Sequence, residues 1–530
     1  MATTLAVPVS EQLRQSATRG LDQRFGAAVA SMLTIFSCAV NGYHPYAEDG
    51  GVYLAGVKRL LHPELYPHGS AFVMEHLRFS LFAPMMAGLV RGSHVGLTVV
   101  LLATYVASIW VTLFAGWQLA ARCYESRAAR GGATMLLAAW IGLPLAGTAL
   151  MLMDPYISAR SISTPCTLLA LVGMLDALQG EGRERWRGLA LCVVSLLVAG
   201  VLHPLMAAYG LGFVLLLAAI SVRQAGMRAV GTVGLCLLAM GIAWMVQETA
   251  APESAAYLSV VMTRTYWFVG RWTWYEQFGL VAPLLILGMA GVHWQKADGY
   301  CAGRAAVVRA LLARAAVVGG AAAMLVATVF ARAELSTHLV ARLQPLRMFQ
   351  MVYVVMIVVV GAELGERVLR RSVARWMIAM VLLGGPMMLA ERRTFPDSAH
   401  IEVPGRTPKN AWEQAFEWIR DNTPVDALFA IDARYIDAPG EDAQTFRAIA
   451  ERSVLPDSAK DGGEVSITPS LTAAWVEGVT AQRGLSAASD AERETRLKPL
   501  GVQWLVLERG ARTDFACAYE NSAVKVCRLP

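Results

Sequence analysis

Apolar residues fill long segments of the chain up to about residue 390, and polar residues gather between these segments. A helix needs roughly 17–25 mostly apolar residues to cross a bilayer, and a helix that is apolar on every face is a buried or membrane-spanning one. The pattern therefore predicts an all-α polytopic membrane domain of about eleven transmembrane helices, at residues 25–40, 94–121, 133–151, 162–179, 186–202, 204–222, 229–247, 278–294, 306–330, 348–364 and 375–390.

Residues 72–90 are also apolar, but Glu75, Arg78 and Pro84 interrupt them. Short cytoplasmic loops carry an excess of Lys and Arg. If 72–90 does not cross, the basic loops all lie on the side of the N-terminus, at residues 122–130, 183–187, 223–228, 296–309 and 367–375. We therefore expect 72–90 to lie on the membrane or to be re-entrant, and everything from about residue 391 onward to lie outside.

The N-terminal segment, residues 1–24, is polar and contains three arginines. The apolar run that follows has no small-residue cleavage site, which predicts an uncleaved signal anchor with a cytoplasmic N-terminus. Residues 25–390 would then form the transmembrane domain. Residues 391–530 would form a separate domain on the external side.

The external domain has the pattern of a small soluble α/β fold. Trp412, Ala415, Phe416 and Ile419 recur at helical spacing and predict an amphipathic helix that ends at residues 422–424. Strands are predicted at 427–431 and 502–507, a hairpin or strand pair at 516–529, and further helices at 441–453, 469–480 and 489–497.

Composition agrees with a membrane protein, because 56% of the 530 residues are hydrophobic and only 16% are charged, against about 25% charged in soluble domains. The net charge of +6 arises mostly from arginines in the short loops, so we expect no nucleic-acid partner. Cys517 and Cys527 stand at the two ends of the predicted hairpin. A disulfide there would require an oxidising compartment; the alternative is a pair of free thiols in a cytosolic domain.

The predicted external loops carry most of the polar and aromatic clusters. The first loop begins with Tyr43-His44-Pro45-Tyr46-Ala47-Glu48-Asp49-Gly50-Gly51. Later loops contribute Asp154, Arg160, His203, Arg264, Arg271 and Arg347, together with several tryptophans. The cytoplasmic loops contain chiefly arginine and spacer residues. This asymmetry indicates a functional site on the external face, although interfacial tryptophans are also ordinary membrane anchors.

The carboxylates of these loops suggest acid–base chemistry. A general base must lie within hydrogen-bond reach of the hydroxyl that it deprotonates. Adjacent acids on a loop cannot both point at one atom, so Asp49 or Glu48 would act and the other would orient a group or bind a metal. Asp154 could share a divalent cation, Mg²⁺ or Mn²⁺, with Asp49. The alternatives are solvated loop acids for Glu48 and Asp49 and a helix-end residue for Asp154.

The basic residues of the same loops could bind phosphate. Arginine suits bidentate recognition of phosphate oxygens, although arginines at helix ends also snorkel to the interface. The candidates are Arg160, Arg264, Arg271 and Arg347, and Arg347 is the best because residues 344–347 form a rigid turn directly before a span. His203 precedes Pro204 and is a candidate phosphate or substrate contact, as are His44 and Tyr46. The histidine spacings match no zinc motif.

Taken together, the chain resembles membrane glycosyltransferases of the C-type (GT-C) fold, which use polyprenyl-phosphate sugars on the outer side of a membrane. In that superfamily an acidic pair follows the first span, here Glu48-Asp49. The first external loop holds juxtamembrane helices, here 52–61 and 72–90. A second acid lies in the second external loop, here Asp154, and a late loop carries an arginine for the donor phosphate, here Arg347.

The resemblance implies an inverting enzyme of the cell envelope in a bacterial inner membrane, with its C-terminal domain in the periplasm. Its partners would be a lipid-linked sugar donor and a glycan, lipid or protein acceptor. The tail with Trp412 and residues 418–424 also resembles the tails of uncharacterised bacterial membrane proteins. Rival interpretations are a transporter, a non-catalytic scaffold with a partner-binding external domain, and a polymerase or ligase of undecaprenyl-linked glycans.

Overall fold

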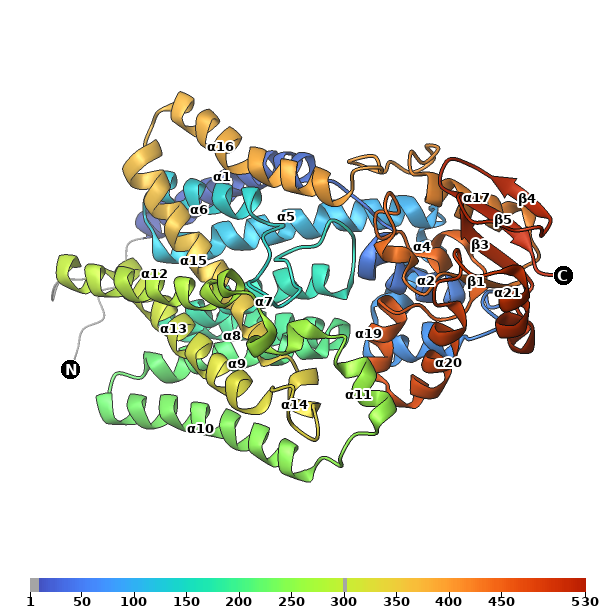
Figure 1. Ribbon diagram of the computed structural model, residues 1–530. Coiled ribbons are helices and arrows are strands. Elements are labelled where there is room, and N and C mark those ends of the chain that lie inside the picture. The colour runs from blue at the N-terminus through green and yellow to red at the C-terminus, as the bar shows by residue number, and fades with distance from the viewer. Residues whose placement is uncertain (1–8, 299–302) are drawn as a thin grey trace.

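A computed structural model of the protein describes residues 9–298 and 303–530 and shows a helical domain followed by a small α/β domain (Figure 1). Within this part of the chain ten segments are long and apolar enough to cross a membrane, which confirms the predicted fold class of a multi-pass membrane protein. They are α1 (Val9–Asn41), α5 (Leu97–Cys123), α7 (Ala159–Gln179), α8 (Gly182–Leu202), α9 (Pro204–Ser221), α10 (Ala225–Thr249), α12 (Trp274–Asp298), α13 (Arg304–Phe330), the segment Leu339–Leu369, and α16 (Val373–Thr394).

One of the roughly eleven predicted spans is not a full helix. In place of 133–151, α6 (Arg127–Ala139) covers 13 residues, or about 20 Å at 1.5 Å per residue, against a hydrocarbon thickness of about 30 Å. Residues 140–158 continue without helix, held by backbone bonds such as Met153 N to Ile141 O (2.8 Å). Non-helical backbone at membrane depth is tolerated where it is buried in protein or lines a cavity. The loop 140–158 lines a cavity.

The loop between α1 and α5 contains only short helices. They are α2 (Glu48–Leu61), α3 (Ala71–Met74), a 3₁₀ turn at Glu75–Phe79 and α4 (Phe82–Ser93). At 12 residues, α4 is too short to cross a bilayer. The interpretation of 72–90 as a non-crossing segment therefore agrees with the structure. α4 buries Phe82, Ala83 and Met86 on one face, which packs toward α2 and α5.

At the centre of the helical domain lies α15 (Phe349–Glu363), which is buried on nearly every face. It crosses α6 closely: a Cβ on Gly361 would come within 2.6 Å of Gly132 O. α15 is preceded by α14 (Leu339–Arg342) and by a 3₁₀ turn at Pro345–Met348, and is followed by a π-helical turn at Leu364–Leu369. The central position of α15 holds the turn that carries Arg347.

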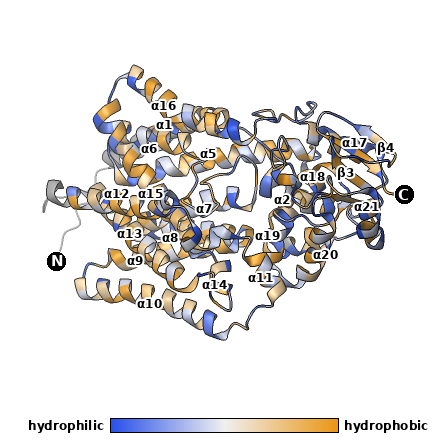
Figure 2. Cartoon of the chain, viewed as in Figure 1, coloured by the Kyte–Doolittle hydropathy of each residue, from blue (hydrophilic) through white to orange (hydrophobic). Residues whose placement is uncertain are grey.

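The outermost helices expose apolar side chains. Only 6% of the apolar stretch of α10, and 6% of that of α16, is buried within the protein. Val230 and Val381 are among the exposed residues. Figure 2 shows hydrophobic residues concentrated along the helices of this domain. Such surfaces fit contact with lipid, where apolar side chains need no burial against protein.

The C-terminal domain is built on a five-stranded sheet in the order β2-β1-β3-β5-β4. The strands are β1 (Leu428–Ile431), β2 (Ser453–Val454), β3 (Trp504–Glu508), β4 (Cys517–Glu520) and β5 (Val524–Arg528); β1 pairs in parallel with β2 and β3, and β5 antiparallel with β3 and β4. Cys517 and Cys527 are joined by a disulfide across β4 and β5.

Most elements of this domain lie where the pattern predicts them. α17 (Ala411–Asn422), α20 (Thr472–Gln482) and α21 (Asp490–Leu497) match predicted helices, and the strands match except β2, which was not predicted. The helix expected over 441–453 is reduced to α18 (Phe446–Ala450), because the chain turns at Glu451 (φ 53°) and enters β2. α19 (Lys460–Ile467) was also not predicted.

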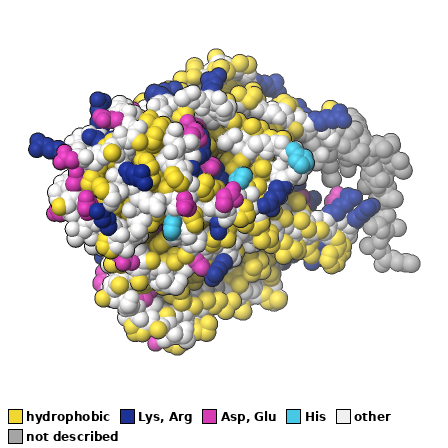
Figure 3. Space-filling view, turned by 90° about the vertical axis from the view of Figure 1, so that its right-hand side faces the viewer, with side chains coloured by type: hydrophobic (Ala, Val, Ile, Leu, Met, Phe, Trp, Pro, Cys, Tyr) yellow, Lys and Arg dark blue, Asp and Glu magenta, His cyan; other side chains and the backbone are white. Residues whose placement is uncertain are grey.

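The two domains are in direct contact. Tyr43 pairs with Ile401 and Ala47 with Gln444 as isolated β-bridges. α11 (Ala255–Val261), in the loop after α10, packs against α19 and α20. Viewed from the end of the molecule that bears the C-terminal domain, acidic, basic and histidine side chains are interspersed over the surface (Figure 3).

Candidate functional site

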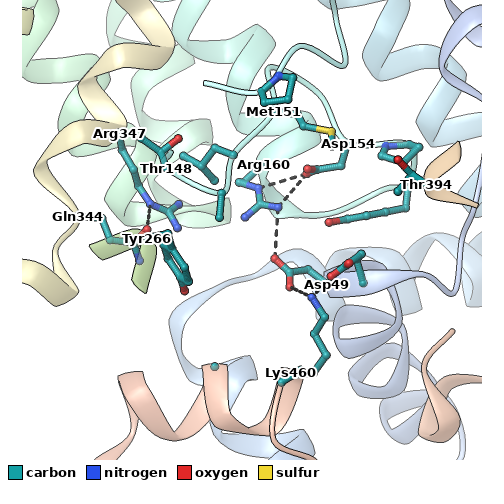
Figure 4. Close-up of a pocket in the computed structure, with 18 of the residues that line it drawn as sticks. Asp49, Thr148, Met151, Asp154, Arg160, Tyr266, Gln344, Arg347, Thr394 and Lys460 are labelled. Atoms are coloured by element: carbon teal, nitrogen blue, oxygen red, sulfur yellow. Dashed lines mark hydrogen bonds and ion pairs between the residues drawn. The ribbon is translucent and has the colours of Figure 1, made fainter. Parts of the chain in front are cut away.

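A cavity of about 350 Å³ lies where the C-terminal domain meets the helical domain. Seven segments form its wall, and most of them are far apart in the sequence. They are the start of α2, the loop 144–156, the start of α7, the turn after α11, the turn before α15, the end of α16 and the start of α19. Figure 4 shows the polar side chains that face one another across it.

The acidic pair opens α2, which begins at Glu48. Acids in the first turn of a helix are favoured by the helix dipole. The two glycines that follow allow close packing: a Cβ on Gly50 would lie 2.8 Å from the Tyr156 ring, and one on Gly51 would collide with Thr445 of the C-terminal domain. The motif therefore brings the acids, the loop before α7 and the C-terminal domain to one point.

Arg160, at the start of α7, joins two of the cavity's carboxylates. Its Nη2 lies 2.9 Å from Asp154 Oδ2 and 3.3 Å from Asp49 Oδ2 (Figure 4). Arg160 and Asp154 are mostly buried, with 11% and 8% of their side chains exposed, whereas Asp49 is 41% exposed. Burial raises the pKa of Asp154, and the attraction of Arg160 opposes this rise.

Lys460, the first residue of α19, reaches the acidic pair from the C-terminal domain. Its Nζ forms ion pairs with Glu48 and with Asp49 Oδ1, the latter at 3.2 Å. Burial alone would lower the pKa of Lys460, but Asp49 and Glu48 together outweigh it and raise that pKa above its usual range. Sequence reasoning missed this residue, and no local pattern marks a lysine whose partner lies 411 positions away.

Arg347 lies on the side of the cavity away from Asp154 (Figure 4). It is 9% exposed; its Nε donates to Gln344 Oε1 (2.8 Å) and its Nη1 lies 3.6 Å from Met206 Sδ. Gln344 has a positive φ of 49°, which tightens the turn that aims Arg347. Among the described residues no carboxylate forms an ion pair with Arg347. A buried cation without a counter-ion is costly, so this wall favours an anionic ligand.

Arg264 also lines the cavity, but its donors are engaged elsewhere. Nη1 donates to Ala459 O (2.9 Å), Nη2 to Ser458 O (3.0 Å) and Nε to Thr263 Oγ1 (2.9 Å). Arg264 therefore holds the segment that leads into Lys460. This role differs from the phosphate contact that the sequence suggested.

The structure places four candidate residues outside the cavity lining: His44, Tyr46, His203 and Arg271. His44 is buried against Phe395 and lies 2.8 Å from a Glu402 oxygen, at the domain junction. Tyr46 packs between the cores of the two domains.

His203 caps α9, where Nδ1 accepts from Met206 N (3.4 Å). The Arg271 guanidinium is exposed and lies over the Phe268 ring. All four were selected because polar and aromatic residues stand out in an apolar chain. The same residue types also make the helix caps and domain contacts found here.

The carboxylates do not fit a divalent cation as they are arranged. Mg²⁺ and Mn²⁺ need several free oxygen ligands, but the Asp49 oxygens contact Lys460 and Arg160, and Asp154 Oδ2 also contacts Arg160. Across the described parts of the chain, no group of three or more His, Cys, Asp or Glu residues could hold a metal ion. The expected sharing of a metal by Asp49 and Asp154 is therefore not supported by the donor set.

Comparison with known proteins adds one match. Residues 410–460 match a family model described as a domain of unknown function (DUF6798). The matched segment runs from the cap of α17 through β1, α18 and β2 to Lys460. No curated protein matches the chain.

Proposed function

We propose that this cavity is the active site of a membrane glycosyltransferase, which moves a sugar from a polyprenyl-phosphate donor to a glycan, lipid or protein acceptor. One observation carries the proposal. A half-exposed acidic pair lines the same cavity as a buried arginine that has no carboxylate partner among the described residues, although most of the membrane domain separates them in sequence. An acid for the acceptor and a cation for the leaving phosphate are the two groups that such a transfer requires.

The donor phosphate would bind at Arg347. Its guanidinium is fixed by Gln344, and no carboxylate in residues 9–298 or 303–530 forms an ion pair with it. Fixed, pre-oriented donors stabilise a leaving anion more than mobile ones because they need no reorganisation during the reaction. Arg160 and Arg264 are engaged with protein groups, which leaves Arg347 as the cation of this cavity best placed for phosphate.

The acceptor would be activated at the acidic pair. Its hydroxyl oxygen attacks the anomeric carbon and gives its proton to Asp49 or Glu48, while the bond from that carbon to the phosphate oxygen breaks. A single displacement of this kind inverts the anomeric centre. Asp49 and Glu48 are 41% and 42% exposed, whereas Asp154 is buried against Arg160 and would serve to orient it.

The sidedness follows from the same proposal. α1 and α16 both end beside the C-terminal domain, which contains the Cys517–Cys527 disulfide. Disulfides persist in oxidising compartments. This supports a periplasmic C-terminal domain and a cytoplasmic N-terminus, and the proposal places the protein in a bacterial inner membrane.

The test uses the full-length protein in proteoliposomes with a panel of undecaprenyl-phosphate-linked sugars. Transfer is followed by release of undecaprenyl phosphate, and binding of undecaprenyl phosphate by native mass spectrometry. Asp49→Asn should abolish release but keep binding, and Arg347→Met should lose binding. Asp421→Asn, which replaces an exposed acid of the C-terminal domain outside the cavity lining, is the control. Full release by both Asp49→Asn and Glu48→Gln would remove the acidic pair from the mechanism, and sugar flux without release would indicate a transporter.

A further inference from the structure

Lys460 occupies the position at the acidic pair where a metal ion would be expected. Its ammonium contacts one oxygen from each of two adjacent carboxylates, Glu48 and Asp49. An ammonium is a compact, strongly hydrated point charge and in this respect resembles a small divalent cation more than a guanidinium does. The lysine and a metal ion would compete for the same oxygens.

The segment that carries Lys460 is held from both domains. Asp457 Oδ1 accepts from Ala459 N (2.8 Å) and from Lys460 N (2.6 Å), which fixes the start of α19. From the helical domain, Arg264 donates to the carbonyl oxygens of Ser458 and Ala459. Lys460 is thus positioned before any ligand binds, and little further ordering is needed.

The charges explain why a cation is needed at this point. Glu48, Asp49 and Asp154 converge, and Arg160 contacts only Asp49 and Asp154. Neighbouring carboxylates disfavour each other's ionisation. Lys460 supplies the second cation, and it reaches Glu48, which Arg160 does not contact.

We propose that Lys460 is the resident cation of this site and takes the place of a divalent metal, so that the acidic pair is complete only when the C-terminal domain is docked. The contact of Lys460 with the acidic pair does not depend on which reaction the protein catalyses. Its importance for catalysis rests on the proposed function. Lys460 acts through Asp49 and Glu48 and is therefore a positioning residue.

The proposal has a consequence that binding can measure. Removal of the ammonium takes this cation away from the two adjacent, half-exposed carboxylates, while Asp49 keeps its contact with Arg160. Carboxylate oxygens are ligands that suit Mn²⁺. Lys460→Ala should therefore create a Mn²⁺ site that the wild-type protein lacks.

The experiment is Mn²⁺ titration of the purified full-length protein, read by electron paramagnetic resonance. Lys460→Ala should bind one Mn²⁺ more than wild type, and Lys460→Ala combined with Asp49→Asn should lose it. The matched control is Lys498→Ala, which removes a lysine paired with Glu494 on the surface of the same domain and should gain no ion. Lys460→Gln replaces the alanine variant if that variant fails to fold. An Asp49-dependent Mn²⁺ site in wild type, or no gain in either Lys460 variant, overturns the proposal.

Transfer activity gives a second readout. Wild-type release of undecaprenyl phosphate should be insensitive to EDTA. Lys460→Ala should lose about 10²-fold, the order expected for removal of one charged contact at a reacting centre, and Mn²⁺ should restore part of it. If Lys460 only supported the fold, Mn²⁺ would not restore the transfer activity of Lys460→Ala. If wild type transfers no sugar, the proposed function fails, and the Mn²⁺ titration still decides the place of Lys460.

Discussion

Arg347 and Arg160 are both buried arginines at the cavity, but they should respond oppositely to replacement by methionine. Met has a similar reach and no charge. A buried ion carries a desolvation penalty of several kcal/mol, which an apolar Met side chain removes. Arg347 also loses its bond to Gln344 Oε1, and a hydrogen bond to a charged group contributes about 1.5–3 kcal/mol. These terms nearly cancel, so Arg347→Met should lie within about 2 kcal/mol of wild type.

Arg160→Met should behave differently because it leaves the buried Asp154 carboxylate without its partner. Breaking a buried ion pair by removing one member costs about 3–5 kcal/mol. One kcal/mol shifts Tm by about 2–4 °C in domains of 150–250 residues and by less in larger proteins. Arg160→Met should therefore lower the apparent Tm by roughly 5 °C, and Arg347→Met by little or nothing.

The assay is thermal unfolding of both variants in detergent, with and without undecaprenyl phosphate. The lipid phosphate should raise the Tm of wild type but not that of Arg347→Met, since a ligand stabilises only the protein that binds it. The reasoning is refuted if Arg347→Met unfolds as early as Arg160→Met while the lipid phosphate still raises its Tm. Arg347 would then be a structural residue.

Three other predictions concern the C-terminal domain. Burial and neighbouring carboxylates raise the pKa of Glu413 from 4.5 to about 9. The protonated carboxyl therefore contributes its full stabilisation below pH 4.5, and the free energy of unfolding falls by up to about 1.4 kcal/mol per pH unit as the pH rises toward 9. Glu413→Gln should flatten the decline of Tm between pH 6 and pH 9, and an unchanged slope would contradict this assignment. Replacing Cys517 and Cys527 by serine opens a loop of sequence separation 10 and should cost about 2–3 kcal/mol, measured as a lower Tm; dithiothreitol should lower the Tm of wild type but not that of the serine variant. Gly51→Ala should disturb the contact between the domains and reduce transfer. Limited proteolysis should then cleave the junction between the domains faster than in wild type. Wild-type rates of cleavage and transfer would show that the contact adjusts to the added methyl group.

The predicted membrane spans agree with the structure where composition alone decides them. Outer helices such as α10 and α16 are apolar because their exposed faces contact lipid, whichever helices lie beside them. The error at 133–151 has another cause: this segment is apolar because it is buried in the protein, and burial does not require a helix. Gly142, Pro144 and Gly147 were the local signs that the helix stops.

The candidate site was partly predictable for a related reason. Asp49, Asp154, Arg160 and Arg347 line the cavity, and they were noticeable because charged groups are costly near a bilayer. Charged residues are common in a soluble domain, so Lys460 did not differ from its neighbours in the sequence and was missed. His44 and Arg271 were noticed for the same reason as Asp49, but packing assigned them to other contacts.

Amino-acid order was enough to establish a multi-pass helical domain, a small α/β domain after it, and the loops that carry the charged groups. These properties are local, because hydropathy over twenty residues or periodicity over ten already expresses them. Which charged groups meet was decided by tertiary packing alone. The free energy of an ion pair depends on distance and burial, and the contact of Lys460 with Asp49 exists only after two domains have folded and docked.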